Sequence, residues 1–440
     1  MKFPAHMLFS KKRFTEAFEN TDKIYSFLDS GVISLGRFFS GIALAKLSGA
    51  DAFAEYILLT TLLFFVHSIP ASLRIIPMVN LTTGRPRAEQ WPLIRWSRRQ
   101  ARYSLASIAL LGIAGFPIAV GKGIDPWVYS GFALSTIVGI ELLFQRAQAQ
   151  TLFRMKAAFM ADATGLLLHF AGILLCVILG GSPMIGYWWG LAVSSIYSVV
   201  RISRTVERSG STAQDRESKE KTGSAIAQAR YDGRSILVGS LSNSACSRLA
   251  PFVLKSVGGL LAVANFGVVW TLLGPLRMVS AAISSILRPR FALYVNTFDE
   301  AGFDKLFNRT LIGVAAMGSA CSAAAVYVAP YLIEVLFDPS LREAGLMLPL
   351  AMAYATFDVL TTTQMIAMQT RVKKGAKIAA KLRMASAIVS VALIFPLTQF
   401  YGAMGAYVAL LASELVYFAA ARQIVGSGEA RYSKFRSVSP

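Results

Sequence analysis

The sequence predicts an all-α polytopic membrane protein of about 12 transmembrane helices, arranged as two parallel six-helix repeats around a central cavity. The 440 residues are 55% hydrophobic and only 15% charged, whereas soluble domains carry about 25% charged residues. Apolar runs long enough to cross a bilayer recur along the chain. The basic residues behind the net charge of +20 lie between these runs. This placement is typical of topology signals and contacts with membrane lipids, and we expect no nucleic-acid partner.

The apolar runs define the expected membrane spans. They cover residues 25–46, 52–81, 101–121, 126–146, 157–180, 184–203, 234–255, 260–288, 309–330, 343–369, 377–398 and 402–423. The second and eighth of these spans are long. At 1.5 Å rise per residue they exceed the hydrocarbon thickness, so we expect them to tilt or protrude.

The distribution of Lys and Arg predicts the orientation. If the N-terminal tail and every second loop are cytoplasmic, 36 of the 44 Lys and Arg residues fall on that side and four on the other. Positively charged residues concentrate in cytoplasmic loops. We therefore expect both termini in the cytoplasm.

The chain divides into two repeats joined by a polar segment. Residues 24–205 form the N-terminal six-helix repeat and residues 232–425 the C-terminal one. Residues 206–231 are rich in Ser, Gln and charge, which is typical of a flexible cytoplasmic linker. Residues 1–23 and 426–440 are expected to be cytoplasmic tails. In the first tail, aromatic and basic residues alternate, which fits either a short amphipathic helix on the membrane surface or a frayed end.

Internal similarity supports the division into repeats. The matched positions are 54–56 with 264–266, 186–187 with 405–407, Arg37 with Arg248, and Glu141 with Asp358. Each half begins and ends on the same side, so the repeats are parallel. Such repeats are typical of transporters, in which the substrate site lies between the repeats near the midplane.

The basic residues inside the spans are candidates for substrate binding, because an Arg at the centre of a membrane helix costs about 2.5–3.5 kcal/mol on insertion scales. Arg37, Arg248 and Arg277 each lie on a helical face of Ser, Gly or Ala, so we expect them to face a hydrated cavity. Arg74 shares a face with His67, the repeat counterpart of Arg277. Arginine forms bidentate bonds to phosphate, so a phosphorylated headgroup is the expected ligand. In the alternative interpretation these Arg residues neutralise buried acids, and Arg74 extends toward the cytoplasmic face.

The acids inside the spans also have two interpretations. Asp29, Glu141, Asp162 and Asp358 could take up a coupling ion, H⁺ or Na⁺, or they could be salt-bridge partners. The sequence contains no nucleophile–base constellation, no His/Cys metal cluster and no phosphate-binding glycine loop. We therefore expect a transporter with no catalytic residue, no metal and no cofactor other than a coupling ion.

Three segments resemble a known family. Residues 44–56 (LAKLSGADAFAEY) are similar to the turn between its first two spans, and residues 335–344 (VLFDPSLREA) to the turn before its tenth span, although the family usually has Gly where Asp338 stands. Residues 401–407 (YGAMGAY), followed by Ser413 and Glu414, resemble its last-span signature. Over about residues 24–425 the chain is similar to Wzx-type flippases of lipid-linked oligosaccharides, in the multidrug/oligosaccharidyl-lipid/polysaccharide (MOP) export superfamily.

This resemblance implies a function and a location. The family flips undecaprenyl-pyrophosphate-linked oligosaccharide from the inner to the outer leaflet of the bacterial plasma (inner) membrane, for polysaccharide biosynthesis. It implies a cationic cavity that fits Arg37, Arg248 and Arg277, and partners among polysaccharide polymerases and glycosyltransferases. The alternatives are a peptidoglycan-precursor flippase, which usually has fourteen spans, a multidrug exporter, which would need acids facing its cationic substrates, and a membrane glycosyltransferase or polymerase, which would need a large external loop.

Overall fold

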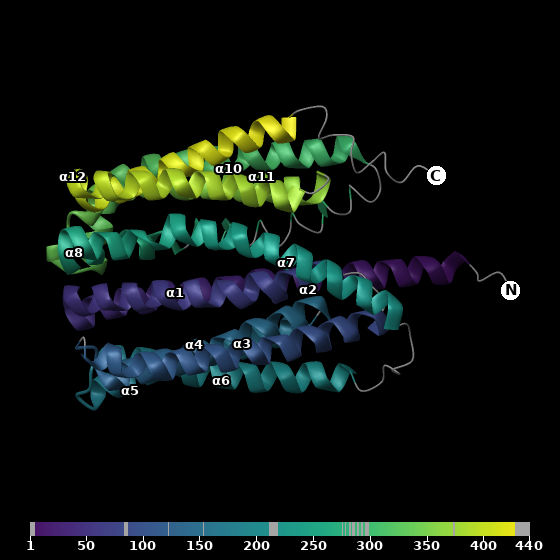
Figure 1. Cartoon of the computed structure of the whole chain (residues 1–440), viewed down its shortest axis with the longest axis horizontal. Helices are drawn as coiled ribbons and strands as arrows, with labels where there is room; N and C mark the ends of the chain where they lie inside the picture. Colours follow the sequence, from purple (N-terminus) through teal and green to yellow (C-terminus); the bar gives the residue numbers. More distant parts are fainter. Residues whose placement is uncertain are drawn as a thin grey trace.

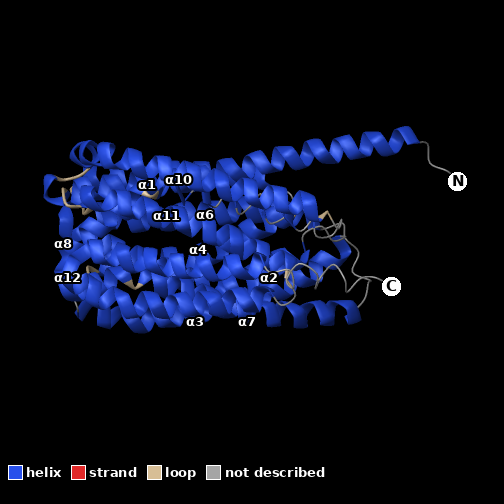
Figure 2. Cartoon of the chain, turned by 90° about the horizontal axis from the view of Figure 1, so that it is seen from above, coloured by secondary structure: helices blue, strands red, loops and turns tan. Residues whose placement is uncertain are grey.

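The computed structural model of the chain is a bundle of long helices that run along one axis (Figures 1 and 2). It describes residues 5–82, 87–121, 123–152, 154–210, 219–274, 299–372 and 375–426, together with scattered positions between 276 and 294. Within these ranges no residue is in a β-strand. The helices are α1 (Ala5–Pro70), α2 (Ile76–Thr82), α3 (Arg87–Gly121), α4 (Pro126–Thr151), α5 (Met155–Ile178), α6 (Pro183–Gly210), α7 (Lys219–Arg248), α8 (Ala250–Leu272), α10 (Glu300–Leu336), α11 (Ala344–Arg371) and α12 (Gly375–Gly426).

Three glycines divide the long helices into shorter ones. Gly49 in α1, Gly259 in α8 and Gly402 in α12 have φ angles of 78°, 72° and 58°, a region that glycine adopts at little steric cost. The helical path therefore changes direction at these points. All three positions coincide with expected boundaries between spans, and Gly49 and Gly259 occupy equivalent places in the two repeats.

The predicted fold class is confirmed, although the count of twelve spans is not reproduced exactly. Eight helical segments in the described part of the chain are long and apolar enough to cross a membrane. Three of these segments, which begin at Ile24, Ala229 and Gly375, are 44 to 56 residues long and contain the glycine breaks. The first and third have room for two spans, since a span needs about 20 residues. The segment from Ala229 ends at Leu272, soon after its break. The expected span 184–203 corresponds to α6, which is not among the eight. The expected span 260–288 continues past α8 into residues that are only partly described.

The two halves lie on opposite sides of the bundle. Figure 1 shows α3–α6 on one side and α10–α12 on the other, with α1, α7 and α8 between them. The packing of α1 against α8 makes the largest contact between the halves, and α7 also reaches the first half at the π-helical turn Ala71–Ile75. Helices α6 and α7 extend into the expected linker 206–231 from its two ends, and residues 211–218 lie outside the described part. In the N-terminal tail, residues 5–23 continue α1 as helix.

The matched repeat motifs pack against each other within each half. In the first half, the rings of Tyr56 and Tyr187 lie 4.9 Å apart, edge to face. In the second half, their counterparts Phe266 and Tyr407 are stacked at 4.7 Å, and the Tyr407 hydroxyl donates to the carbonyl of Phe266. The similarity in sequence therefore marks one packing contact that occurs twice.

The hydrophobic core differs between the two ends of the bundle. We call the end with the three glycine breaks the distal end, and the end where α1 begins and α12 ends the terminal end (Figure 1). At the distal end, residues of both halves form one shared core that includes Phe53, Tyr187, Phe266 and Tyr407. Toward the terminal end each half has a core of its own.

The distal interface is closely packed as well as shared. A Cβ atom added at Gly267 would lie within 3 Å of the Ile57 side chain, and one added at Gly41 would lie 2.8 Å from Cγ2 of Thr271. Lys46 also joins the halves there, since its Nζ donates to the carbonyl of Val335 at 2.7 Å. The structure is therefore closed between the halves at the distal end.

Candidate functional site

The structure brings Arg37 and Arg248 together, as their repeat equivalence predicts. Arg37 lies on α1 before the Gly49 break, and Arg248 is the last residue of α7. Their guanidinium carbons lie 4.5 and 5.3 Å from the centre of one ring, that of Phe64. One phenylalanine is therefore in contact with a cation from each half of the protein.

Arg277 extends this cluster on the side of the second half. Its guanidinium carbon lies 3.2 Å from the ring centre of Trp270 on α8. Arg248 is close enough to both Arg37 and Arg277 for their charges to interact. We refer to Arg37, Arg248 and Arg277 as the arginine cluster.

Within the described residues, no ion pair involves any of the three arginines. Asp358 is close enough to Arg277 for their charges to interact, although its ion pair is with Arg383. Arg37 is exposed although Gly36 and Ser40 beside it on α1 are buried, and Arg248 and Arg277 are half-buried. Nη1 of Arg248 is buried without a hydrogen-bond partner. These groups can therefore receive an anion.

Position along the bundle explains why Arg37 remains accessible. Phe64 and Leu276 border the shared distal core, while Arg37 and Arg248 lie on the terminal side of that border, where the halves have separate cores. The arginine cluster thus lies where the shared core ends. An anion bound there would touch both halves.

Two of the predicted coupling acids form one buried network in the first half. Arg146 of α4 pairs with Asp29 of α1 at 2.5 Å and with Asp162 of α5 at 2.9 Å. Both acids are more than 90% buried. Two carboxylates therefore share one guanidinium, and the salt-bridge interpretation describes the geometry of this pair.

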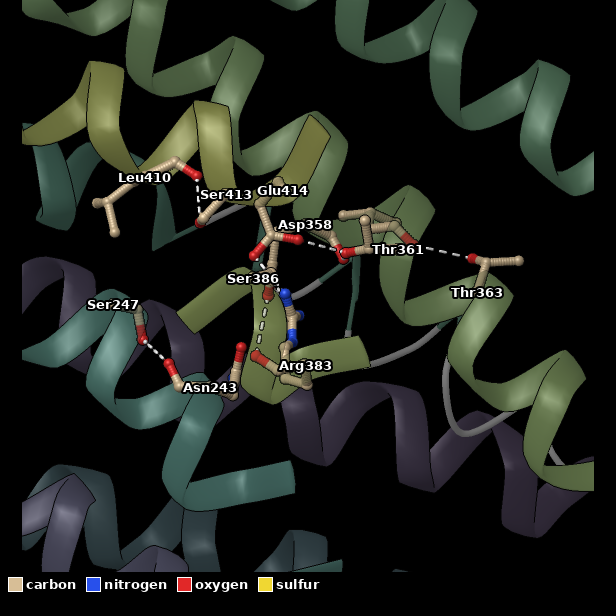
Figure 3. Close-up of polar contacts among 11 residues, drawn as sticks. Asn243, Ser247, Asp358, Thr361, Thr363, Arg383, Ser386, Leu410, Ser413 and Glu414 are labelled. Atoms are coloured by element: carbon tan, nitrogen blue, oxygen red, sulfur yellow. Dashed lines mark hydrogen bonds and ion pairs between the residues drawn. The ribbon is translucent and has the colours of Figure 1, made fainter. Parts of the chain in front are cut away.

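A similar network in the second half involves Asp358. Arg383 of α12 lies 2.6 Å from Glu414 and 3.8 Å from Asp358 of α11, and Thr361 donates to Glu414 at 2.6 Å. Figure 3 shows the Arg383 guanidinium next to the Glu414 carboxylate, with Asp358 nearby. As in the first half, two acids share one arginine.

The remaining predicted residues have hydrogen-bond partners outside the arginine cluster, although His67 is close enough to Arg37 and Arg248 to interact with them electrostatically. His67 donates its Nε2 hydrogen to the carbonyl of Thr136 on α4 at 2.9 Å. Arg74, in the π-helical turn, donates to the carbonyl of Gln100 on α3. Glu141 accepts a hydrogen bond from Gln145 on its own helix at 2.7 Å. The structure thus does not bring Glu141 and Asp358 together, although they are equivalent in the repeats.

Sequence reasoning missed Phe64, Trp270, Arg146 and Arg383. An aromatic residue in an apolar run carries no distinguishing signal. Arg146 and Arg383 lie at the ends of expected spans, where the positive-inside count explains them as loop residues, yet they are 20% and 4% exposed. The surplus of buried acids could have pointed to these two arginines, because buried charges are normally paired.

No site for a metal is evident in the ranges that the structure describes, where no three His, Cys, Asp or Glu residues gather. The arrangement instead offers guanidinium groups from two sides of an interface. Such groups bind phosphate and carboxylate through charge-assisted, often bidentate hydrogen bonds.

Comparisons with solved structures identify the fold. An inward-facing multidrug resistance transporter of the MATE family in the MOP superfamily aligns with a TM-score of 0.68 and 13% identity, over 94% of this chain and 96% of that one. The lipid II flippase MurJ in an inward closed conformation aligns with a TM-score of 0.67 and 12% identity, over 92% and 87%. No family model and no curated protein sequence matches the chain.

A third solved structure has the same fold. It is a MOP superfamily transporter from Pyrococcus furiosus, described as having a binding pocket of reverse polarity that suggests a different function, and it aligns with a TM-score of 0.63 and 14% identity over 92% of this chain and 94% of that one. The chain is therefore a multi-pass membrane protein with the fold of MOP superfamily transporters.

Proposed function

We propose that this protein flips a lipid-linked oligosaccharide, anchored through undecaprenyl pyrophosphate, from the inner to the outer leaflet of the plasma membrane. The observation that supports this most is the arginine cluster, in which cations from both halves meet and form no ion pair with a carboxylate among the described residues. A pyrophosphate offers several oxygens at one end of a lipid. Arg37 can bind it from the first half, and Arg248 and Arg277 from the second.

The proposed mechanism is alternating access. In the predicted orientation the terminal end faces the cytoplasm, so the structure, closed at its distal end, corresponds to the state that receives substrate from the inner leaflet. The headgroup enters between the separate cores and reaches the arginine cluster. Because the bound anion contacts both halves, it can offset the repulsion between their cations and favour closure behind it. Opening of the shared core then releases the headgroup outward.

The acidic networks are the proposed coupling sites. The pairs Asp29/Asp162 and Asp358/Glu414 each place two carboxylates on one guanidinium, so each network has one negative charge in excess. A proton or Na⁺ could neutralise that charge, and Glu141, bonded to Gln145, is a further candidate. Loading and loss of such an ion would alter the packing among helices of the same half.

A multidrug exporter is the second candidate, because solved structures with this fold include multidrug transporters. Such a protein carrying organic cations would need acids facing the substrate path. Here three of the four network acids are buried and all four are held by Arg146 or Arg383, while the arginines of the cluster form no ion pair among the described residues. The polarity therefore favours an anionic substrate.

A reconstituted flipping assay tests the proposal. Purified protein in liposomes should move an undecaprenyl-pyrophosphate-linked oligosaccharide between leaflets, and R37A combined with R248A should abolish most of this activity. R37K should retain part of it, since lysine keeps the charge and loses the bidentate fork. R342A is the matched control, because Arg342 is 72% exposed near the distal end. An R37A/R248A variant that flips at the wild-type rate, or a wild type that exports ethidium and not the glycolipid, would contradict the proposal.

A further inference from the structure

Each member of the arginine cluster lies against an aromatic ring. Arg37 and Arg248 share Phe64, and Arg277 lies over Trp270. The acids inside the bundle are divided differently, since Asp29 and Asp162 belong to Arg146, and Glu414 and Asp358 to Arg383. The arginine cluster therefore differs from Arg383 in lacking an ion pair among the described residues and not in having a ring, since Arg383 also lies 4.7 Å from the ring centre of Tyr417.

The two kinds of partner differ in how readily they give up the guanidinium. An aromatic face attracts a cation through its quadrupole, and this attraction is weaker than a charge-assisted, bidentate hydrogen bond. A carboxylate would have to be displaced by the incoming anion and would be left as an unpaired charge. A displaced phenylalanine leaves no unpaired polar group. Ring contacts thus keep the arginines available to a phosphate.

Phe64 differs from Trp270 because it connects the halves. It lies on α1 after the Gly49 break, and it contacts Arg37 of the same helix and Arg248 of α7. With no anion bound, two like charges face each other near this ring. The negative π face that both guanidinium groups contact reduces the repulsion between them.

We propose that Phe64 is a positioning residue that occupies the place of the substrate phosphate on Arg37 and Arg248 when the transporter is empty. This inference rests on the proposed function. The ring yields to the pyrophosphate on loading and returns when the lipid leaves. Phe64 therefore lowers the affinity for the anion and makes release and the empty return step faster.

The experiment is arginine modification by phenylglyoxal, followed at Arg37 and Arg248 by mass spectrometry, with and without inorganic pyrophosphate. Full-length protein in detergent is compared as wild type, F64L, F64Y and F65L. Leucine removes the π face and keeps an apolar side chain, and tyrosine keeps the ring. F65L is the matched control, since Phe65 is the next residue, is 37% exposed and has no cation–π contact in the described structure.

F64L should react faster than wild type at both arginines, and pyrophosphate should protect it at about three- to tenfold lower concentration, the range to which one cation–π contact corresponds. F64Y should resemble wild type, and F65L should change neither quantity. Equal rates and equal protection in F64L and F65L would overturn the role of Phe64. Faster modification of F64L without protection by pyrophosphate in any variant would instead leave the ring contact standing and overturn the proposed substrate.

Discussion

The two ends of the bundle are built differently. At the distal end, side chains from both halves form one core, closed further by Gly41, Gly267 and the bond from Lys46 to Val335. At the terminal end, each half has a separate core and a separate charged network. Opening the distal end requires the shared core to separate. At the terminal end the halves meet where α7 packs on the π-helical turn, with Gly233 close against the Leu73 carbonyl, and each half keeps a core of its own. We therefore expect each half to move as a unit.

The largest expected effect comes from breaking the terminal networks. R146A leaves the buried Asp29 and Asp162 without their partner, and R383A leaves the buried Glu414 and the half-buried Asp358 without theirs. Loss of one member of a buried ion pair costs about 3–5 kcal/mol. Each variant should lower the thermal unfolding temperature in detergent.

The double variant R146A/R383A sharpens the comparison. The two networks share no residue and lie in different halves, so their effects should add within about 0.5 kcal/mol. Strong coupling between the two substitutions, measured by chemical denaturation of all four proteins, would contradict the independence of the terminal cores.

A smaller effect is expected from overpacking the distal core. G267A places a methyl group against Ile57, and overpacking of this kind costs about 1–3 kcal/mol. It should also weaken distal closure, so a cysteine placed in the shared core should be labelled faster by a soluble maleimide. G313A is the control, because a Cβ at exposed Gly313 meets nothing within 4 Å. Equal labelling in G267A and G313A would show that the distal interface is not tightly packed.

The smallest effect is expected for K46A. Lys46 is exposed, and its single bond to Val335 should contribute no more than about 0.5–1.5 kcal/mol. The unfolding temperature should barely change, while the rate of maleimide labelling in the distal core should rise slightly. A loss of stability as large as that in R383A would mean that one surface contact, and not the shared core, closes this end.

The sequence predicts the parts of this comparison that follow from apolar runs and from repeat equivalence. The apolar runs predict boundaries between spans near Gly49 and Gly259. Repeat equivalence predicts that Arg37 and Arg248 lie near each other. The sequence does not predict the contacts of the Phe64 ring or the ion pair between Arg383 and Glu414, because these depend on how the helices are rotated relative to one another. Residues at equivalent positions of the two repeats can also have different partners. Asp358 lies near Arg383, whereas its counterpart Glu141 accepts a hydrogen bond from Gln145. A pattern in sequence identifies which residues are unusual and does not identify their partners.

The most direct test of alternating access is a reversible lock on the distal end. A Cβ atom at Gly41 lies 3.5 Å from Cβ of Thr271, which matches the separation found across disulfides. The variant G41C/T271C, with Cys176, Cys246 and Cys321 replaced by serine, should therefore form a disulfide between α1 and α8. The oxidised protein should bind pyrophosphate at the arginine cluster and fail to flip the glycolipid, and reduction should restore flipping. Equal flipping in the oxidised and reduced states would contradict the account, because the substrate would then cross without the distal core coming apart.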